Sequence, residues 1–183
     1  MFARSHQPSG HQRRREAVAM AERIGRIPGR RALDVGCGRG LYTRLLIDLG
    51  ASWVTAIDRD ARCLDHLPRD RVTAQQADAA SFASMQPVDI IVAGHLLDHC
   101  RAPRKTLNNL RRSAVTGTRL ILLVTPPTLP GLLLWLWTRL RGRIFRTYSA
   151  RALGRLAFES GWDVEETISL WPFGLIMEFI LRP

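Results

Sequence analysis

The sequence predicts an α/β fold in which helices cover both faces of a doubly wound, mostly parallel sheet. Two observations support this prediction. Short apolar runs alternate with segments of helical periodicity, and the connections between them are brief. In addition, the run 88–94 (VDIIVAG) is almost wholly apolar, as strands are when both faces of their sheet are covered. Seven strand-like runs predict a seven-stranded sheet, and its C-terminal strand is expected to be antiparallel.

The first half of the chain shows the alternation most clearly. Val18, Ala21 and Ile24 recur at helical spacing, and Gly25 ends that helix. Gly50 suits the left-handed end of a second helix. The strands expected in this half are 31–35, 52–58, 71–78 and 88–94, and the helices are 11–25, 41–50 and 61–67.

The second half continues with a helix at 102–114 and a strand at 118–127, which prolines stop. A helix at 149–161 follows, and strands 162–170 and 173–183 are expected to form a hairpin around Trp171 and Pro172 at one edge of the sheet. We therefore expect a single domain, 1–183. Its parts are an N-terminal helix (11–25), a core (30–125), an insert (128–147) and a closing helix with a strand pair (148–183).

The composition is that of a globular domain, with 183 residues, 46% hydrophobic and 23% charged. No window holds the roughly 18 to 20 unbroken apolar residues of a membrane-spanning helix. The N-terminus has basic residues but no apolar run behind them, so no secretory signal is predicted and we expect a cytoplasmic protein. Cys37, Cys63 and Cys100 have no C-x-x-C spacing, which favours reduced thiols over disulfides or a zinc site.

The formal net charge is +11, and Lys105 is the only lysine, so nearly all the basic residues are arginines. One interpretation is codon bias expressed on solvated faces. The other is an acidic partner, such as a nucleic acid, an anionic membrane surface, or a phosphorylated or carboxylated substrate. The charge by itself does not choose between these interpretations.

A glycine-rich loop follows the first strand, in the stretch ALDVGCGRG (32–40). Ligands of open α/β sheets bind beyond the carboxyl ends of the strands, where such a loop lies. The glycines Gly36, Gly38 and Gly40 are spaced G-x-G-x-G, and Leu41 stands where a dinucleotide-binding fingerprint has its third glycine. Asp34 precedes them, and a carboxylate favours a ligand with a cationic amine over a pyrophosphate.

Two further acids lie at predicted strand ends. Asp58 comes about 20 residues after the loop, the spacing of a ribose-binding acid, although it could instead cap the next helix. Asp78 could accept from an adenine amine, with the Ala79 amide at a ring nitrogen, or Asp78 could be a cap. An amino acid, a ribose and an adenine, in that order, describe S-adenosylmethionine as the cofactor.

The stretches LDVGCGRG, AIDRD, QADA and IIVAGHLLDHC together resemble the class I S-adenosylmethionine-dependent methyltransferases, over about residues 30–125. The resemblance implies a Rossmann-like methyltransferase fold and an enzyme that releases S-adenosylhomocysteine (SAH). It also implies that the backbone of Gly36–Gly40, including Cys37, approaches the methionine part of the cofactor. Asp58 would bind the ribose, Asp78 and Ala79 the adenine, and Arg59 would lie near the adenine face. The Cys37 side chain is expected to pack.

The exit of the fourth strand, GHLLDHCRAP, supplies candidate bases. His95 and His99 are four residues apart and can share one face of a helical turn, with Asp98 between them. If the acceptor is a hydroxyl, either histidine could remove its proton. His95 should also border the methyl donor, whereas His99 could instead bond the backbone and shape the turn.

This turn is similar to the glutamate–histidine turn of the ubiquinone-biosynthesis O-methyltransferases. Asp98 stands in place of the glutamate, and Ala102-Pro103 matches the aspartate–proline. In that family several members use the turn near the acceptor, sometimes with a divalent metal. No metal-binding residues are predicted here, and the need for a metal is left open.

The composition of the insert (128–147) gives information on the chemical class of the methyl acceptor. Residues 132–137 are consecutively apolar, and four arginines follow at 139, 141, 143 and 146. The segment could be a buried helix with a solvated end, a wall of a lipophilic acceptor pocket, or an interfacial helix in which 129–146 contacts an anionic membrane. Base methylation is less favoured, because GHLL replaces the N/D-P-P-Y/W motif of amino-group methylation and Cys100 follows His99 instead of a proline.

The sequence thus predicts methyl transfer from S-adenosylmethionine to a small, hydrophobic acceptor that carries a hydroxyl or similar nucleophile. Two alternatives stay open. The arginines could serve an RNA methyltransferase, or the chain could be a non-catalytic module that binds the cofactor or a partner.

Overall fold

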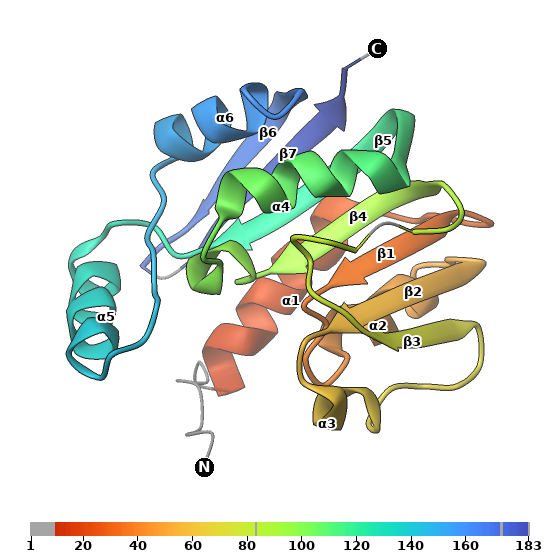
Figure 1. The fold of residues 1–183 in the computed structure, drawn as a ribbon, viewed down its shortest axis with the longest axis horizontal. Helices are drawn as coiled ribbons and strands as arrows, with labels where there is room; N and C mark the ends of the chain where they lie inside the picture. Colours follow the sequence, from red (N-terminus) through yellow and green to blue (C-terminus); the bar gives the residue numbers. More distant parts are fainter. Residues whose placement is uncertain (1–9, 83, 173, 183) are drawn as a thin grey trace.

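The computed structural model describes residues 10–82, 84–172 and 174–182. These residues form one seven-stranded sheet in the order β3-β2-β1-β4-β5-β7-β6 (Figure 1). β1 to β5 pair in parallel, whereas β7 is antiparallel to both β5 and β6. This confirms the predicted doubly wound sheet with an antiparallel C-terminal strand, and the hairpin lies at the predicted edge.

The strands are β1 (Arg31–Val35), β2 (Trp53–Asp58), β3 (Val72–Gln76), β4 (Val88–Gly94), β5 (Ala114–Val124), β6 (Trp162–Leu170) and β7 (Gly174–Leu181). The helices are α1 (Gly10–Ile24), α2 (Leu41–Asp48), α3 (Ala61–Leu64), α4 (Pro103–Leu110), α5 (Leu129–Leu140) and α6 (Ala150–Phe158), with short 3-10 helices η1 (Leu97–His99) and η2 (Arg111–Ser113). The predicted helix 102–114 is shorter, and β5 begins where that helix was expected to end. Positions 1–9, 83, 173 and 183 of the predicted domain lie outside the described residues.

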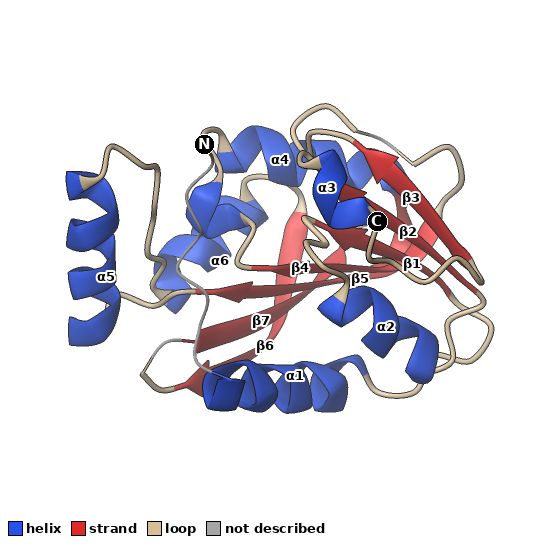
Figure 2. Cartoon of the chain, turned by 90° about the horizontal axis from the view of Figure 1, so that it is seen from below, coloured by secondary structure: helices blue, strands red, loops and turns tan. Residues whose placement is uncertain are grey.

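The helices form two layers around the sheet. α1 and α2 cover one face, and α4 and α6 cover the other (Figure 2). β4 is buried on both faces as predicted, because Ile90 and Val92 pack with α1 and α2 while Ile91 and Ala93 pack in the other layer. α5 stands apart from both layers, at the end of the molecule toward which β4 and β5 point (Figures 1 and 2).

Helix α1 is rotated from the orientation that the sequence predicts. Val18 is 52% exposed, whereas Glu16, Met20 and Ile24, each four residues apart, are buried. Ile24 belongs both to the predicted set and to the set that is buried. The helix has so few apolar residues that their spacing alone did not decide which side faces the core. The consequence is that Glu16 points into the protein, near the carboxyl ends of the central strands.

An ion-pair cluster around a buried carboxylate fixes α1 against the sheet. Arg119 on β5 donates to the carbonyl oxygens of Arg23 and Ile24, over 2.7 and 2.9 Å, at the C-terminal end of α1. Those carbonyls have no partner within the helix, and a cation is favourable there. Glu178 on β7 is 3% exposed and pairs with both Arg119 and Arg23. Sheet and helix are thereby joined through one carboxylate.

We expect Glu178→Ala to lower the free energy of unfolding by about 1.5–3 kcal/mol, the value of hydrogen bonds to charged groups. Urea denaturation would measure it. Glu165→Ala, on the exposed part of β6, is the matched control and should change stability by about 0.5 kcal/mol or less. Equal losses in the two variants would show that Glu178 does not anchor α1.

Candidate active site

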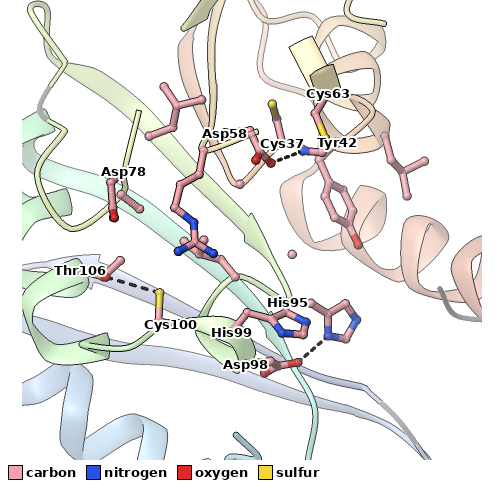
Figure 3. Close-up of a pocket in the computed structure, with 18 of the residues that line it drawn as sticks. Cys37, Tyr42, Asp58, Cys63, Asp78, His95, Asp98, His99, Cys100 and Thr106 are labelled. Carbon is pink, nitrogen blue, oxygen red and sulfur yellow. Dashed lines mark hydrogen bonds and ion pairs between the residues drawn. The ribbon is translucent and has the colours of Figure 1, made fainter. Parts of the chain in front are cut away.

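A cavity of about 550 Å³ lies at the carboxyl ends of the central strands. Figure 3 shows His95, Asp98 and His99 gathered on one side of it, with Asp58 and Asp78 across from them. The predicted residues that line it are Gly36, Cys37, Gly38, Asp58, Arg59, Asp78, Ala79, His95, Asp98 and His99. Asp34 and Gly40 do not line the cavity, which differs from the prediction.

The glycine loop leaves room over the cavity. Gly38 has a φ of 50°, which disfavours other residues, and a Cβ there would enter open space. The amides of Gly36 and Cys37 both donate to the carbonyl oxygen of Ile57, and that of Gly38 donates to Asp58. Because these three amides have protein acceptors, they do not form an anion-binding cradle. The loop therefore favours a ligand other than a diphosphate.

Asp58 ties the end of β2 to this loop. Its Oδ2 accepts from the Gly38 amide and its Oδ1 from the Asp60 amide, both at 2.9 Å. An ionised carboxylate has about four acceptor positions, so it can still accept from a ligand. The cap of α3 is Asp60, whose side chain accepts from the amide of Arg62. The alternative in which Asp58 caps that helix is therefore wrong.

Asp34 lies behind the loop and is fully buried. Thr43 on α2 donates to its Oδ2 over 2.6 Å, while its Oδ1 has no hydrogen-bond partner among the described residues. Burial raises the pKa of Asp34 to about 7. The carboxyl group thus holds the start of α2, and its second oxygen is enclosed by the protein, away from the cavity. Gly40, at the N-cap of α2, has no place in the cavity wall.

Asp78 and Ala79 form the turn after β3. The Asp78 side chain accepts from the amide of Ala80 over 2.8 Å, so it does cap this turn, as one alternative proposed. Asn109 on α4 donates to the Ala79 carbonyl over 3.0 Å and fixes the turn beside the cavity. Both residues line the cavity. Their proposed role toward adenine stays a prediction.

Cys37 lines the cavity and packs with Ala56 and Leu67, as expected of its side chain. Burial raises the pKa of its thiol, which leaves it a poor nucleophile. Cys37, Cys63 and Cys100 are all free. In the part of the chain that the structure describes, no three His, Cys, Asp or Glu side chains gather to hold a metal ion.

His95 lies between two carboxylates. Its Nδ1 is 2.8 Å from Oδ2 of the buried Asp98, and its Nε2 is 3.5 Å from Oε1 of Glu16 on α1. Gln12 also donates to Glu16, over 2.8 Å. Burial opposes the charged imidazolium, but the bonds to Asp98 and Glu16 outweigh it and raise the pKa of His95 to about 10. At neutral pH this ring is protonated on both nitrogens, which differs from the expectation that it is a base.

His99 has the opposite environment. Its Nδ1 is 3.3 Å from the carbonyl oxygen of Ile144, and its ring meets Phe145 edge to face at 5.3 Å. A carbonyl can only accept, so Nδ1 carries the proton and Nε2 the lone pair. Burial lowers the pKa of His99, which keeps the ring neutral at neutral pH. His99 therefore both shapes the turn, as one alternative expected, and can accept a proton.

Several lining residues were missed from the sequence: Gln12, Arg13, Glu16, Tyr42 and Thr125. The spacing of Glu16 with Met20 and Ile24 was a signal that could have found it. Tyr42 approaches the tip of β4 so closely that a Cβ at Gly94 would lie 2.2 Å from its ring. Leu134 and Phe145, from the predicted acceptor insert, also line the cavity.

Residues 9–167 match a family model described as a methyltransferase domain. The chain belongs to this family. The fold agrees, because a methyltransferase from Mesorhizobium loti has a TM-score of 0.76 at 15% identity, covering 93% of this chain and 98% of that one. Magnesium protoporphyrin IX methyltransferase from Synechocystis, solved with bound SAH, has a TM-score of 0.73 at 20% identity, covering 99% and 91%. These comparisons confirm the predicted family and support S-adenosylmethionine as its cofactor.

Curated relatives carry a more specific name. Ribosomal RNA small subunit methyltransferase A of Cereibacter sphaeroides is 32% identical over 153 residues, covering 82% of this chain and 53% of that protein. The Rhizobium etli protein of the same name is 31% identical over 160 residues, covering 80% and 52%. The chain spans about half the length of these relatives. The similarity to ubiquinone-biosynthesis enzymes stays a prediction.

The cavity fits the cofactor that the family implies. Its volume lies within the range of small-molecule sites, about 300–1,000 Å³. The open space at Gly38 and the carboxylate of Asp58, which both line the cavity, match a methionine backbone and a ribose.

Removal of the Asp58 carboxylate should weaken cofactor binding. We expect Asp58→Ala to raise the Kd for S-adenosylmethionine by about 10- to 150-fold, the loss of a charged hydrogen bond worth about 1.5–3 kcal/mol. Titration calorimetry would measure it. Asp60→Ala removes an equal charge two residues away, on a residue that does not line the cavity, and should leave the Kd nearly unchanged. An unchanged Kd in Asp58→Ala would rule out the ribose assignment.

Proposed function

We propose that this domain transfers a methyl group from S-adenosylmethionine to the hydroxyl, or a similar nucleophile, of a small hydrophobic acceptor. The observation that carries the proposal is the neutral His99, which shares one cavity with the glycine loop and Asp58. In this proposal Asp58 binds the ribose, Asp78 and Ala79 bind the adenine, and the glycine loop lies against the methionine part. Arg59 lies on the adenine side.

The cofactor supplies an electrophilic methyl group on a sulfonium, and the chain supplies alignment and a base. The Nε2 lone pair of His99 takes the proton of the acceptor hydroxyl. The Ile144 carbonyl keeps the opposite nitrogen protonated, so the ring presents the correct tautomer. The nearby Asp98 then favours the imidazolium that this proton transfer creates.

His95 has a different role in this proposal. Held between Asp98 and Glu16, it carries a positive charge at the cavity wall. An imidazolium has no lone pair for a proton, and both N–H groups of His95 face carboxylates, so this residue acts through its charge. In this proposal His95 supplies a positive charge at the cavity wall, Asp98 positions His95, and His99 is the base.

The apolar part of the acceptor would lie against Leu96, Leu134 and Phe145. Leu134 and Phe145 come from the insert that follows β5, so this segment serves as a wall of the acceptor pocket. An acceptor of low water solubility also accords with the predicted membrane contact of 129–146. Among the described helices, none is long and apolar enough to cross a membrane. The predicted cytoplasmic location stays a prediction.

Ribosomal RNA is the second candidate acceptor. The curated relatives named above and the net charge of +11 favour it. The histidine pair after β4, in place of an N/D-P-P-Y/W motif, opposes transfer to a base amine. The third candidate, a module without catalytic activity, would bind the cofactor and transfer nothing.

Tritium transfer separates the three candidates. The protein is incubated with methyl-tritiated S-adenosylmethionine and either a bacterial lipid extract in neutral detergent or bacterial ribosomal RNA. We expect label in the solvent-extractable products. Label confined to RNA, with binding that weakens steeply with salt, would replace our proposal by the second candidate. Cofactor retention without any transfer would replace it by the third.

The base assignment makes a kinetic prediction. His99→Ala should lower turnover by about 10²- to 10⁴-fold, the usual contribution of general base catalysis, with cofactor affinity unchanged. His66→Ala, an exposed histidine outside the cavity, is the control. Because the pKa of His99 is lowered and the base must be neutral, the wild-type rate should fall only in solution more acidic than pH 6.5, and it should be level from there until His95 loses its proton near its pKa of about 10. Full turnover in His99→Ala would refute the assignment.

A further inference from the structure

Helix α5 exposes its apolar side to solvent. Leu129, Leu133 and Leu140 are 73%, 59% and 80% exposed, and Leu132, Leu136 and Trp137 are also exposed. The spacing i, i+3, i+4, i+7, i+8 and i+11 places these six side chains on one side of the helix; we call them the leucine stripe. The opposite side holds the buried Gly131 and Thr138, and Leu134 faces the active-site cavity. The alternative of a buried helix with a solvated end is therefore wrong.

Arginines surround the C-terminal end of this helix. A second cavity, of about 640 Å³, opens there, and we call it the arginine cavity. It is lined by Trp135, Arg139, Gly142, Arg143, Ile144, Phe145, Arg146 and Thr147. The sequence has no acidic residue between Asp98 and Glu159, so the insert itself is wholly basic. Arg141 lies 3.9 Å from the ring centroid of Trp137, so a cation also borders the leucine stripe.

We propose that the leucine stripe and the arginine cavity dock this domain on a bilayer of anionic phospholipids. The leucines enter the acyl-chain boundary, and a lipid phosphate occupies the arginine cavity. A helix of 12 residues is too short to span the roughly 30 Å hydrocarbon core, so it lies in the interface. This docking proposal rests on the proposed function, because docking would bring the enzyme to a lipophilic acceptor in the bilayer.

The side chains favour a membrane over other occupants. A second copy of the chain would bring two sets of positively charged residues together, which repel each other. RNA would neutralise the arginines, but bases stack on aromatic rings, and five of the six stripe residues are leucines. An anionic bilayer offers both acyl chains to the leucines and phosphates to the arginines.

The docking surface adjoins the active site. Leu134, on the protein side of α5, lines the active-site cavity, and Phe145 lines both cavities. The neighbouring Ile144 carbonyl fixes the ring of His99. A hydrophobic acceptor dissolved in the bilayer can therefore approach His99 along the insert without crossing bulk water.

Vesicle co-sedimentation tests the proposal on the whole chain. We expect binding to vesicles of phosphatidylcholine with phosphatidylglycerol, weaker binding to phosphatidylcholine alone, and release by salt. The double variant Leu133→Ser/Leu136→Ser should lose binding to both. Val115→Ser/Val164→Ser, at two exposed strand positions, is its matched control and should bind normally.

The arginine cavity is tested separately. Arg139→Gln/Arg143→Gln should weaken binding to the anionic vesicles by about fivefold for each arginine, since each contributes about 1 kcal/mol near such a surface. The control Arg151→Gln/Arg155→Gln removes the same charge from the exposed side of α6 and should have a smaller effect. Circular dichroism and thermal melting establish that each variant is folded.

Several outcomes would overturn the docking proposal. Two of them concern vesicles: equal binding to neutral and anionic vesicles, or binding that the leucine substitutions do not change. The third is binding of RNA in place of vesicles, lost when the two arginines are substituted. The fourth is a dimer that the leucine substitutions dissociate. Loss of the proposed function is distinguishable from all of them. Tritium transfer in detergent needs no vesicle, and co-sedimentation needs no catalysis.

Discussion

Asp98 is the carboxylate on which the candidate site depends. It is fully buried at the turn after β4, and its oxygens accept from the amide and the hydroxyl of Thr125 at the end of β5, over 3.2 and 2.7 Å, and from His95. Its backbone carbonyl accepts from the Arg146 amide over 2.8 Å. A buried charge without such partners would cost several kcal/mol. One residue therefore fixes two strand ends and a histidine through its side chain, and the return of the insert after α5 through its backbone.

This arrangement gives two histidines four residues apart opposite protonation states. His95 is charged because Asp98 and Glu16 outweigh its burial, whereas His99 is neutral because burial dominates. Glu16 reaches the site because Arg119 and Glu178 hold the end of α1 against the sheet. An ion pair whose carboxylate is buried thus helps to determine a charge at the cavity wall, and of the two rings only the neutral His99 has a lone pair for a proton.

The fold was largely predictable because its signals are local. Apolar runs marked the strands, and the glycine loop, Asp58 and Asp78 followed strand ends that a parallel sheet brings to one edge. The errors concern the rotation of helix α1 and the burial of single side chains, both of which depend on tertiary packing. Glu16 was missed because α1 carries two similar apolar patterns, and Asp34 was expected beside the ligand although it lies behind the loop. The spacing of His95 and His99 indicated a pair. Their protonation states could not be predicted from the sequence, because they depend on neighbours that the fold supplies, Glu16 beside His95 and Phe145 beside His99.

The insert after β5 has one side in the wall of the active-site cavity and the other side on the surface of the protein. Its inner side chains, Leu134 and Phe145, complete the cavity, while its leucine stripe faces outward. A helix that served only as a pocket wall would gain no stability from leucines on its outer side, because a buried leucine is worth about 1.5–3 kcal/mol relative to an exposed one. The outward leucines accord with the apolar environment that our docking proposal places outside the insert. The same environment would hold an acceptor that Leu134 and Phe145 can receive, so the inner and outer sides of the insert favour one class of molecule.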